Sequence, residues 1–218
     1  MKYDAAGEWV TLGGSIFSNK QVPGYLYNRY ISNHFDWDNS FLPVYEKGFS
    51  LRVSSQKLKT VLGLDVSQFK NDLFWQPSGV VNQAGNYNKD WLIEDDKVSV
   101  VSYFLETNLR LWKFHVHEKV LYQYSSHSAV IPLPEWSSYT SFYFQDLWYN
   151  NVMLAQIGVD LFYYTSFYSP LYMPATGVFV NQREIKTGDY PIVSAFFNFK
   201  VKRLAFFIKF DHVNYKLS

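Results

Sequence analysis

The chain has 218 residues, enough for one domain with a real core, and its 20 Lys and Arg nearly balance 19 Asp and Glu, for a formal net charge of +1. This balance excludes the strong basic excess of a nucleic-acid-binding protein, and the absence of cysteine excludes a disulfide scaffold, a thiolate metal site and a cysteine nucleophile. Aromatic residues make 20% of the chain and charged residues 18%, which is typical of either a very aromatic core or a surface that meets lipid.

A period-two alternation of apolar and polar residues runs through most of the chain and predicts an all-β fold. It is clearest near residues 152–167, where Ile157 and Val159 share one face while Gln156 and Asp160 share the other. No stretch shows sustained helical spacing, and every apolar run is far shorter than the ~20 residues that a transmembrane helix needs. About nine strands are expected, at residues 8–17, 48–55, 60–70, 97–108, 113–124, 139–149, 152–167, 191–201 and 203–214.

The connections between these strands alternate between long and short. Tight turns are expected at 56–59, 109–112, 150–151 and Lys202, and long segments at 18–47, 71–96, 125–138 and 168–190. An antiparallel meander with short turns at one rim and long loops at the other has this order, whereas the Greek-key crossovers of a soluble sandwich do not require it. The sequence therefore predicts an up-and-down meander that forms a transmembrane outer-membrane β-barrel.

Amphipathic rings gather near the expected strand ends, where a barrel would meet the two membrane interfaces. One group is expected near the short turns: Trp9, Trp112, Trp148 and Tyr149. The other group is expected near the long loops: Trp75, Trp91, Trp136, Tyr139 and Tyr168. We interpret both groups as aromatic belts, with the filling of a large soluble core as the alternative.

The more polar face of the strands is predicted to line a wet lumen, because a strand in hydrocarbon survives only in a closed sheet with an apolar outer face. Its charges have both signs, so little net selectivity is expected. The candidate lumen residues are Asp65, His115, His117, Lys119, Gln123, Gln156, Asp160, Asn198, Lys200, Lys209 and Asp211. Glu118 breaks the pattern, since it shares a face with Val116 and Val120. We expect Glu118 near a rim or at a contact between protomers rather than at mid-membrane.

Several distinctive segments occur from Asn33 onward and are densest in residues 115–214. They are His34–Asn39, Glu118–Gln123, Ile131–Pro134, Ser169–Ala175, Thr187–Pro191, Phe197–Arg203 and Phe206–His212. Through these segments the chain resembles the putative porin family of Bacteroidetes outer membranes, most specifically at the Tyr190-Pro191 strand start and the Lys202-Arg203 turn. The resemblance implies an outer-membrane barrel with a pore function.

The chain departs from the pattern of that family at both ends. Members begin with an export signal and finish with a strand that ends in an aromatic residue, whereas this chain begins at Met1-Lys2 and stops at Leu217-Ser218. An odd strand count also does not close a bacterial single-chain barrel. We therefore expect residues 1–218 to be a single barrel segment that is truncated at both ends.

Three other groupings carry weaker signals. His115-x-His117 places two imidazoles on one strand face, but this spacing binds zinc only with further ligands. Asp36, Asp38 and the cluster Glu94–Asp96 lie in long loops, where solvated charges are preferred over calcium ligands. Residues 125–128 read Ser-Ser-His-Ser, without a hydrolase signature such as Gly-x-Ser-x-Gly. The sequence therefore predicts no metal, no cofactor and no enzymatic activity.

These observations predict a porin-like channel in the outer membrane of a Gram-negative cell. Small hydrophilic solutes would diffuse through it passively, and the long loop 168–190 would narrow the passage. Its expected partners are outer-membrane lipid and small solutes, without nucleic acid, and a homo-oligomer or a larger outer-membrane assembly stays open. A structural or docking barrel with a plugged lumen is the alternative function, and a soluble aromatic β-sandwich is the alternative fold.

Overall fold

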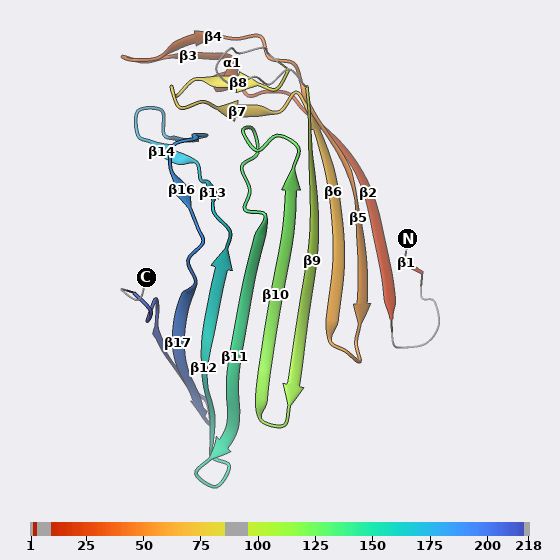
Figure 1. The fold of residues 1–218 in the computed structure, drawn as a ribbon, viewed down its shortest axis with the longest axis vertical. Coiled ribbons are helices and arrows are strands. Elements are labelled where there is room, and N and C mark those ends of the chain that lie inside the picture. Colours follow the sequence, from red (N-terminus) through yellow and green to blue (C-terminus); the bar gives the residue numbers. More distant parts are fainter. Residues whose placement is uncertain (1, 4–9, 86–95, 216–218) are drawn as a thin grey trace.

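A computed structural model of the chain describes residues 2–3, 10–85 and 96–215. One antiparallel sheet of ten strands dominates it, and each strand pairs with its neighbours along the chain (Figure 1). The strands of this sheet, in spatial order, are β1 (Lys2–Tyr3), β2 (Thr11–Gln21), β5 (Val44–Ser55), β6 (Thr60–Lys70), β9 (Lys97–Leu111), β10 (Phe114–Ser125), β11 (Trp136–Trp148), β12 (Met153–Tyr164), β17 (Ile192–Val201) and β18 (Leu204–Phe210). The predicted all-β up-and-down meander is confirmed. The sheet is not closed in this chain, because β18 does not pair with β1.

The predicted strands are all present, with differences at their ends. The first predicted strand is shifted, because β2 runs from Thr11 to Gln21, and residues 8 and 9 of the prediction lie outside the described part. Strand β5 begins at Val44 and β11 at Trp136, earlier than predicted. The sequence missed β1, a short strand in which Lys2 pairs with Gly13 and Tyr3 with Leu12.

Short and long connections alternate along the sheet as predicted. Turns join β5 to β6, β9 to β10, β11 to β12 and β17 to β18 at one rim, and several of their residues have positive φ, including Lys59 at 49°, Trp112 at 58° and Lys202 at 51°. The tight turn predicted at 109–112 is shorter than expected, since β9 continues to Leu111. Ladder pairing through Leu111 and Phe114 extends both strands to this rim.

The long connections contain small hairpins that gather at the opposite end of the sheet, at the top of Figure 1. They consist of α1 (Tyr25–Asn28), β3 (Arg29–Ile31), β4 (Asp36–Asp38), β7 (Leu73–Trp75), β8 (Val81–Gln83), β13 (Phe167–Tyr168), β14 (Leu171–Met173), β15 (Val178–Val180) and β16 (Lys186–Thr187). The pairs are β3 with β4, β7 with β8, β13 with β16, and β14 with β15. No helix in the described ranges has the length and apolar composition to cross a membrane.

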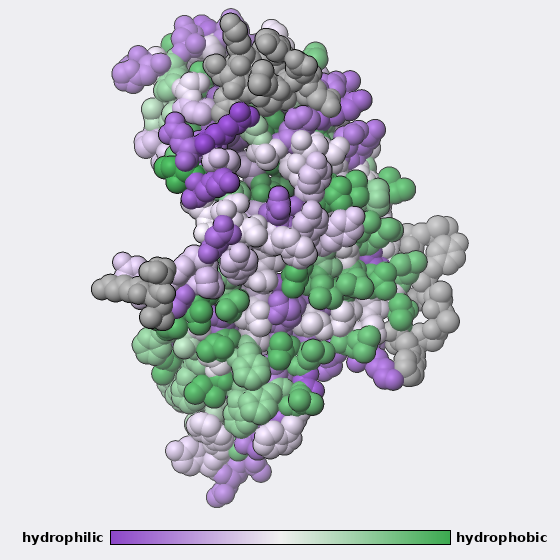
Figure 2. Space-filling view, viewed as in Figure 1, coloured by the Kyte–Doolittle hydropathy of each residue, from purple (hydrophilic) through white to green (hydrophobic). Residues whose placement is uncertain are grey.

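Few apolar side chains of the long strands are buried. Ile16 is 90% exposed, Ile157 53% and Ile208 45%. The face of the sheet that is seen in Figure 2 is green over much of its lower half. The other sheets in the described residues have only two strands each, so the structure does not have the two large facing sheets of a soluble sandwich. Within the described ranges, a cluster of buried apolar residues lies at the long-loop end and combines Phe74, Ala84, Val98 and Val130.

Candidate functional site

The register of the sheet brings every candidate lumen residue to one face, which we call the polar face. Paired residues in an antiparallel ladder project to the same side. Asp65 pairs with Ser102, which pairs with Gln123. Gln156 likewise pairs with Asn198. Successive pairs of this kind place on the polar face Asp65, His115, His117, Lys119, Gln123, Gln156, Asp160, Asn198, Lys200 and Lys209. Asp211 follows β18 and accepts a hydrogen bond at 2.9 Å from Ser194 of this face.

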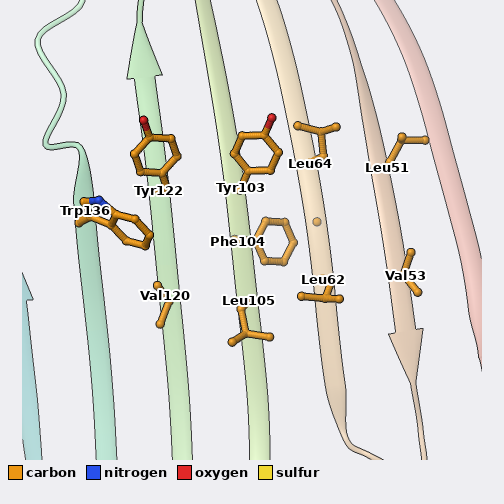
Figure 3. Close-up of a pocket in the computed structure, with 11 residues that line it drawn as sticks. Leu51, Val53, Leu62, Leu64, Tyr103, Phe104, Leu105, Val120, Tyr122 and Trp136 are labelled. Carbon is orange, nitrogen blue, oxygen red and sulfur yellow. The ribbon is translucent and has the colours of Figure 1, made fainter.

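The opposite face, called the apolar face here, is mostly aliphatic and aromatic, with polar exceptions such as Glu118 beside Thr140 and Lys47 beside Ser18 and Gln68. Figure 3 shows its central part, where aliphatic side chains of β5, β6, β9 and β10 surround a hollow of about 520 Å³. Tyr103 and Tyr122 border this hollow, and their hydroxyl groups point toward the long-loop end. Trp136 packs on Tyr122 with ring centroids 4.9 Å apart. This arrangement matches the amphipathic belt that aromatic rings form at a membrane interface.

The aromatic belts were predicted only in part. Near the short turns, Trp112, Trp148 and Tyr149 are exposed, but Trp9 lies outside the described residues, as does Trp91 at the other end. Two placements were wrong. Tyr139 lies on the polar face, since it pairs with Lys119 and Phe162. Trp75 packs in the loops against Trp37 and Tyr27, each with centroids 5.8 Å away.

A charged cluster on β5 and β6 is centred on Asp65. Arg52 Nη2 donates to both oxygens of the Asp65 carboxylate, at 2.8 and 2.9 Å, and Ser50 Oγ donates a third hydrogen bond at 2.5 Å. Arg52 also lies over the Phe104 ring at 4.4 Å from its centroid. Arg52 Nη1 also donates to the carbonyl oxygens of Leu51 and Leu64, at 2.9 and 3.3 Å, so bonds from two nitrogens hold the guanidinium in place. The Arg52 and Asp65 side chains remain about one third exposed. The charges therefore stay in contact with the space in front of the polar face.

A second cluster joins β9 and β10. Glu106 Oε1 lies 3.1 Å from His117 Nε2 and 3.2 Å from Lys119 Nζ. His115 stacks on the Tyr143 ring with centroids 4.8 Å apart. The two histidines thus contact different neighbours. The described residues contain no group of three or more His, Asp or Glu side chains arranged to hold a metal ion.

A third group spans β11, β12, β17 and β18. Lys209 Nζ lies 3.6 Å from the Asp160 carboxylate and 3.1 Å from that of Asp211. Gln156 Nε2 donates to Gln145 Oε1 at 2.8 Å. This part of the polar face is hollowed by about 400 Å³. The residues that border the hollow combine rings with amides and charges: Tyr139, Ser141, Tyr143, Gln156, Asp160, Phe196, Asn198, Phe207 and Lys209.

Glycines let aromatic rings lie flat against the polar face. Phe104 covers Gly63, and a Cβ at this glycine would overlap the ring. A Cβ at Gly48 or Gly158 would lie 2.7 Å from Cζ of Phe17 or Phe196, respectively. An aromatic side chain over a strand glycine replaces the packing that the glycine lacks. These rings therefore line the polar face without projecting far from it.

The long loops form a packed cap at one end of the polar face. We use "loop cap" for residues 71–85, 126–131 and 178–185. Val98, at the start of β9, pairs with Phe69 on the polar-face side and is fully buried against Phe74 and Val130. Because this anchor points to the polar side, the cap covers that side of the sheet rather than the apolar one.

Buried amide side chains fasten the loop cap. Asn181 Nδ2 donates to the carbonyl oxygens of Ala129 and Val130, both at 2.8 Å. The backbone N–H of Asn181 donates to Trp75 O at 2.7 Å. Gln83 Nε2 donates to Leu42 O at 2.7 Å and to Asn71 O at 2.9 Å. Segments far apart in the sequence are thus tied together by backbone acceptors.

Two carboxyl groups in the loops have shifted pKa values. Burial raises the pKa of Asp72 above its ordinary value. Hydrogen bonds from the Ser166 side chain and backbone lower the pKa of Asp189, which also accepts one from Tyr163 Oη at 3.3 Å. Asp189 therefore keeps its charge to lower pH than a free aspartate does. Its contact with Tyr163 links the connection between β12 and β17 to the end of β12.

The other sequence groupings take structural positions. Asp36 forms an ion pair with Arg29 at 2.8 Å, while Glu94 and Asp95 lie outside the described residues. Ser126 Oγ accepts a hydrogen bond from the Ser99 amide at 2.9 Å and lies 3.1 Å from His127 Nδ1. The Ser126 hydroxyl thus ties the loop to the end of β9.

Sequence reasoning missed several charged members of the polar face, among them Arg52 and Glu106. Arg52 alternates with Leu51 and Val53, so its position had a usable signal. Glu106 had a weaker one, because β9 carries apolar residues on both faces, including Val100 on the polar side and Val101 on the other. Buried apolar residues under the loop cap blur the alternation of this strand.

Comparisons with known proteins agree with this architecture. The family described as "Putative porin" matches residues 1–218. Among solved structures, the FrpB iron transporter from Neisseria meningitidis (F3-3 variant) is similar with a TM-score of 0.58 and 11% identity, over 96% of this chain and 33% of that one. The chain thus spans about a third of that transporter's length, and the likeness concerns the fold. A search of curated proteins gives no match.

Proposed function

The chain belongs to the putative porin family, and on that premise we propose that it forms part of an outer-membrane β-barrel through which small hydrophilic solutes diffuse passively. The observation that carries this proposal is the division of one sheet into a charged polar face and a bare apolar face. In hydrocarbon, backbone groups must pair within a closed sheet whose outside is apolar. The apolar face would then contact outer-membrane lipid, and the polar face would enclose water.

The charged groups of the polar face suit passage without tight binding. Acidic side chains at Asp65, Glu106 and Asp160 all have cationic neighbours within 4 Å. Paired charges offer a solvated path but attract neither sign of ion strongly. We therefore expect transport down a gradient, with weak charge selectivity and no catalysis. Nothing in this mechanism requires a cofactor or a nucleic acid.

The loop cap supports an additional role as a constriction. It is held by buried side chains and covers the polar side at the long-loop rim. A firmly packed cap also favours the second candidate function, a docking barrel whose lumen is plugged. The two functions differ in whether the assembled barrel conducts.

Planar-bilayer recording of the full-length protein tests the proposal. We expect discrete current steps with a reversal potential near zero in a salt gradient. Arg52→Gln removes a cation from the polar face and is expected to shift selectivity toward cations, whereas Asp65→Asn is expected to shift it toward anions. The measurement is the reversal potential of each variant under the same gradient.

Lys47 provides a control on the same strand. It lies five residues before Arg52 in β5 and, because the two positions differ by an odd number, on the apolar face, where it pairs with Ser18 and Gln68. Lys47→Gln is expected to leave the reversal potential unchanged. A folded wild-type barrel without current steps would eliminate free passage and favour the plugged docking barrel. Equal shifts from Lys47→Gln and Arg52→Gln would refute the assignment of faces.

A further inference from the structure

Two hollows adjoin each other on the polar face. The first is the hollow of about 400 Å³ over β11, β12, β17 and β18. The second, of about 310 Å³, lies over β9, β10, β11 and β12, and most of the side chains that line it belong to the polar face. Tyr139 lines both, and we call the two together the double hollow. Small-molecule sites typically have volumes of about 300–1,000 Å³, so each hollow can hold a small solute.

An ion pair lines each hollow. Lys209 Nζ lies 3.6 Å from the Asp160 carboxylate in the first, and Lys119 Nζ lies 3.2 Å from Glu106 Oε1 in the second. Such a pair places a donor beside an acceptor without net charge, which favours an uncharged solute over an ion. A hydroxyl group both donates and accepts hydrogen bonds. The ion pairs therefore suit a neutral solute with several neighbouring hydroxyl groups.

An aromatic ring forms the floor of the first hollow. Phe196 lies over Gly158, where a Cβ would come within 2.7 Å of Cζ of the ring. Phe104 lies over Gly63 in the same manner, but the Arg52 guanidinium covers its face at 4.4 Å from the centroid. In the described part of the chain, no cation lies over Phe196. The face of the Phe196 ring is therefore open to the hollow.

Polar groups beside this ring have unused hydrogen-bonding capacity. Asn198 Nδ2 lies 3.5 Å from Gln156 Oε1, which is a long hydrogen bond. Asn198 Oδ1 and the Tyr143 hydroxyl make no hydrogen bond with any described residue. The Tyr143 ring lies against Phe196 with centroids 6.2 Å apart. Donors and acceptors thus surround an open ring face.

We propose that the double hollow binds a neutral carbohydrate, with one sugar ring in each hollow, an inference that rests on the proposed function because the polar face must line the passage. The C–H face of a sugar ring packs against the electron-rich face of an aromatic ring, and Phe196 offers such a face. The hydroxyl groups at the edge of the sugar both donate and accept, and the pair of Asp160 with Lys209 offers partners for both roles.

Other neutral solutes use only part of this arrangement. A flat aromatic solute would stack on Phe196 but would leave the ion pair without hydroxyl partners. A linear polyol would reach the ion pair but has no ring to stack on Phe196. A carbohydrate is the class that uses both features, and the two adjoining hollows suit more than one sugar unit.

Calorimetric titration of the folded full-length protein tests this inference, in a detergent without a sugar headgroup. The probes are maltotriose, cellotriose and xylotriose, which differ in linkage or in hydroxyl groups. We expect saturable binding of at least one trisaccharide, about tenfold tighter than binding of sorbitol or nicotinamide. No saturable binding of any trisaccharide, or equal binding of sorbitol or nicotinamide, would overturn the inference.

Phe196→Leu tests the stacking contact, and Phe17→Leu is its matched control. Phe17 also covers a strand glycine of the polar face, Gly48, but lines neither hollow. We expect Phe196→Leu to weaken trisaccharide binding about tenfold and Phe17→Leu to leave it unchanged. A heat-dependent shift on gels verifies that both variants fold. Equal affinities of the two folded variants would overturn the inference.

Asp160→Asn tests the hydrogen-bonding contact with little change of shape. Lys209 keeps a carboxylate partner in this variant, because Asp211 lies 3.1 Å from its Nζ. Loss of the charged acceptor is expected to weaken trisaccharide binding about tenfold. Unchanged affinity in the folded variant would contradict the role of the ion pair and overturn the inference.

Conductance in planar bilayers distinguishes this inference from the proposed function, because calorimetry does not require an open passage. Current steps from a protein that binds no trisaccharide would reject the carbohydrate site and retain passive passage. Saturable trisaccharide binding by a folded protein that does not conduct would retain the site and reject passage.

Discussion

Replacing Asn181 with leucine is expected to loosen the loop cap and raise single-channel conductance. The change removes both hydrogen bonds from Nδ2 and leaves the buried carbonyl oxygens of Ala129 and Val130 without that donor. An unsatisfied buried polar group costs about 1–3 kcal/mol, and 2 kcal/mol raises an open population about thirtyfold. Conductance in planar bilayers and uptake of a large hydrophilic dye by vesicles measure the effect.

Gln76→Leu is the matched control for Asn181→Leu. Gln76 is buried to a similar degree in the same loop cap, but its side-chain Nε2 has no hydrogen-bond partner. Its replacement therefore removes no bond from that atom and is expected to leave conductance unchanged. If both variants conduct like the wild type, the cap does not limit passage; if both are equally leaky, the Asn181 hydrogen bonds are not what closes it.

Gly63→Ala is expected to destabilise the assembled barrel more than an alanine at a strand glycine such as Gly13, where a Cβ has room. The new Cβ would overlap the Phe104 ring, which must move and release the Arg52 guanidinium that lies over it. Overpacking of this kind costs about 1–3 kcal/mol. The measurement is the urea midpoint of the full-length protein in lipid vesicles.

Gly13 supplies the control in the same row of the sheet, because Gly13 and Gly63 both pair with Arg52. The nearest atom to a Cβ at Gly13 is Arg52 Cβ at 4.0 Å, so alanine fits there. Gly13→Ala is expected to be neutral or stabilising by about 0.5–1 kcal/mol. Phe104→Leu in the Gly63→Ala background should recover part of the loss. Equal midpoints for the two glycine variants would contradict the packing of Phe104 on Gly63.

The strands and the polar face could be predicted because both depend on local alternation. In β12, Ile157 and Val159 alternate with Gln156 and Asp160, and no distant contact is needed to assign their faces. The short connections are likewise determined by the few residues of each turn. The family resemblance pointed to the same fold, and the family match covers residues 1–218.

The loop cap could not be predicted, because its contacts join distant residues. Asn181 binds Val130 across 51 positions, and Gln83 binds Leu42 across 41. No periodicity in the sequence marks such pairs. The same limit explains Trp75, which packs on Trp37 rather than at a strand end. Tyr139 was misplaced for a different reason: proximity to a strand end was read without its face, which the pairing with Lys119 determines.

Solvent accessibility of neighbouring residues in β12 tests the central claim most directly. Nitroxide labels at Gln156 and Ile157, one at a time in the full-length protein in lipid vesicles, probe opposite faces of the same strand. The label at Gln156 is predicted to collide with a water-soluble nickel complex, and the label at Ile157 with oxygen dissolved in the acyl chains. A label at Ile157 that reports water, or one at Gln156 that reports acyl chains, would contradict the assignment of a wet polar face and a lipid-facing apolar face.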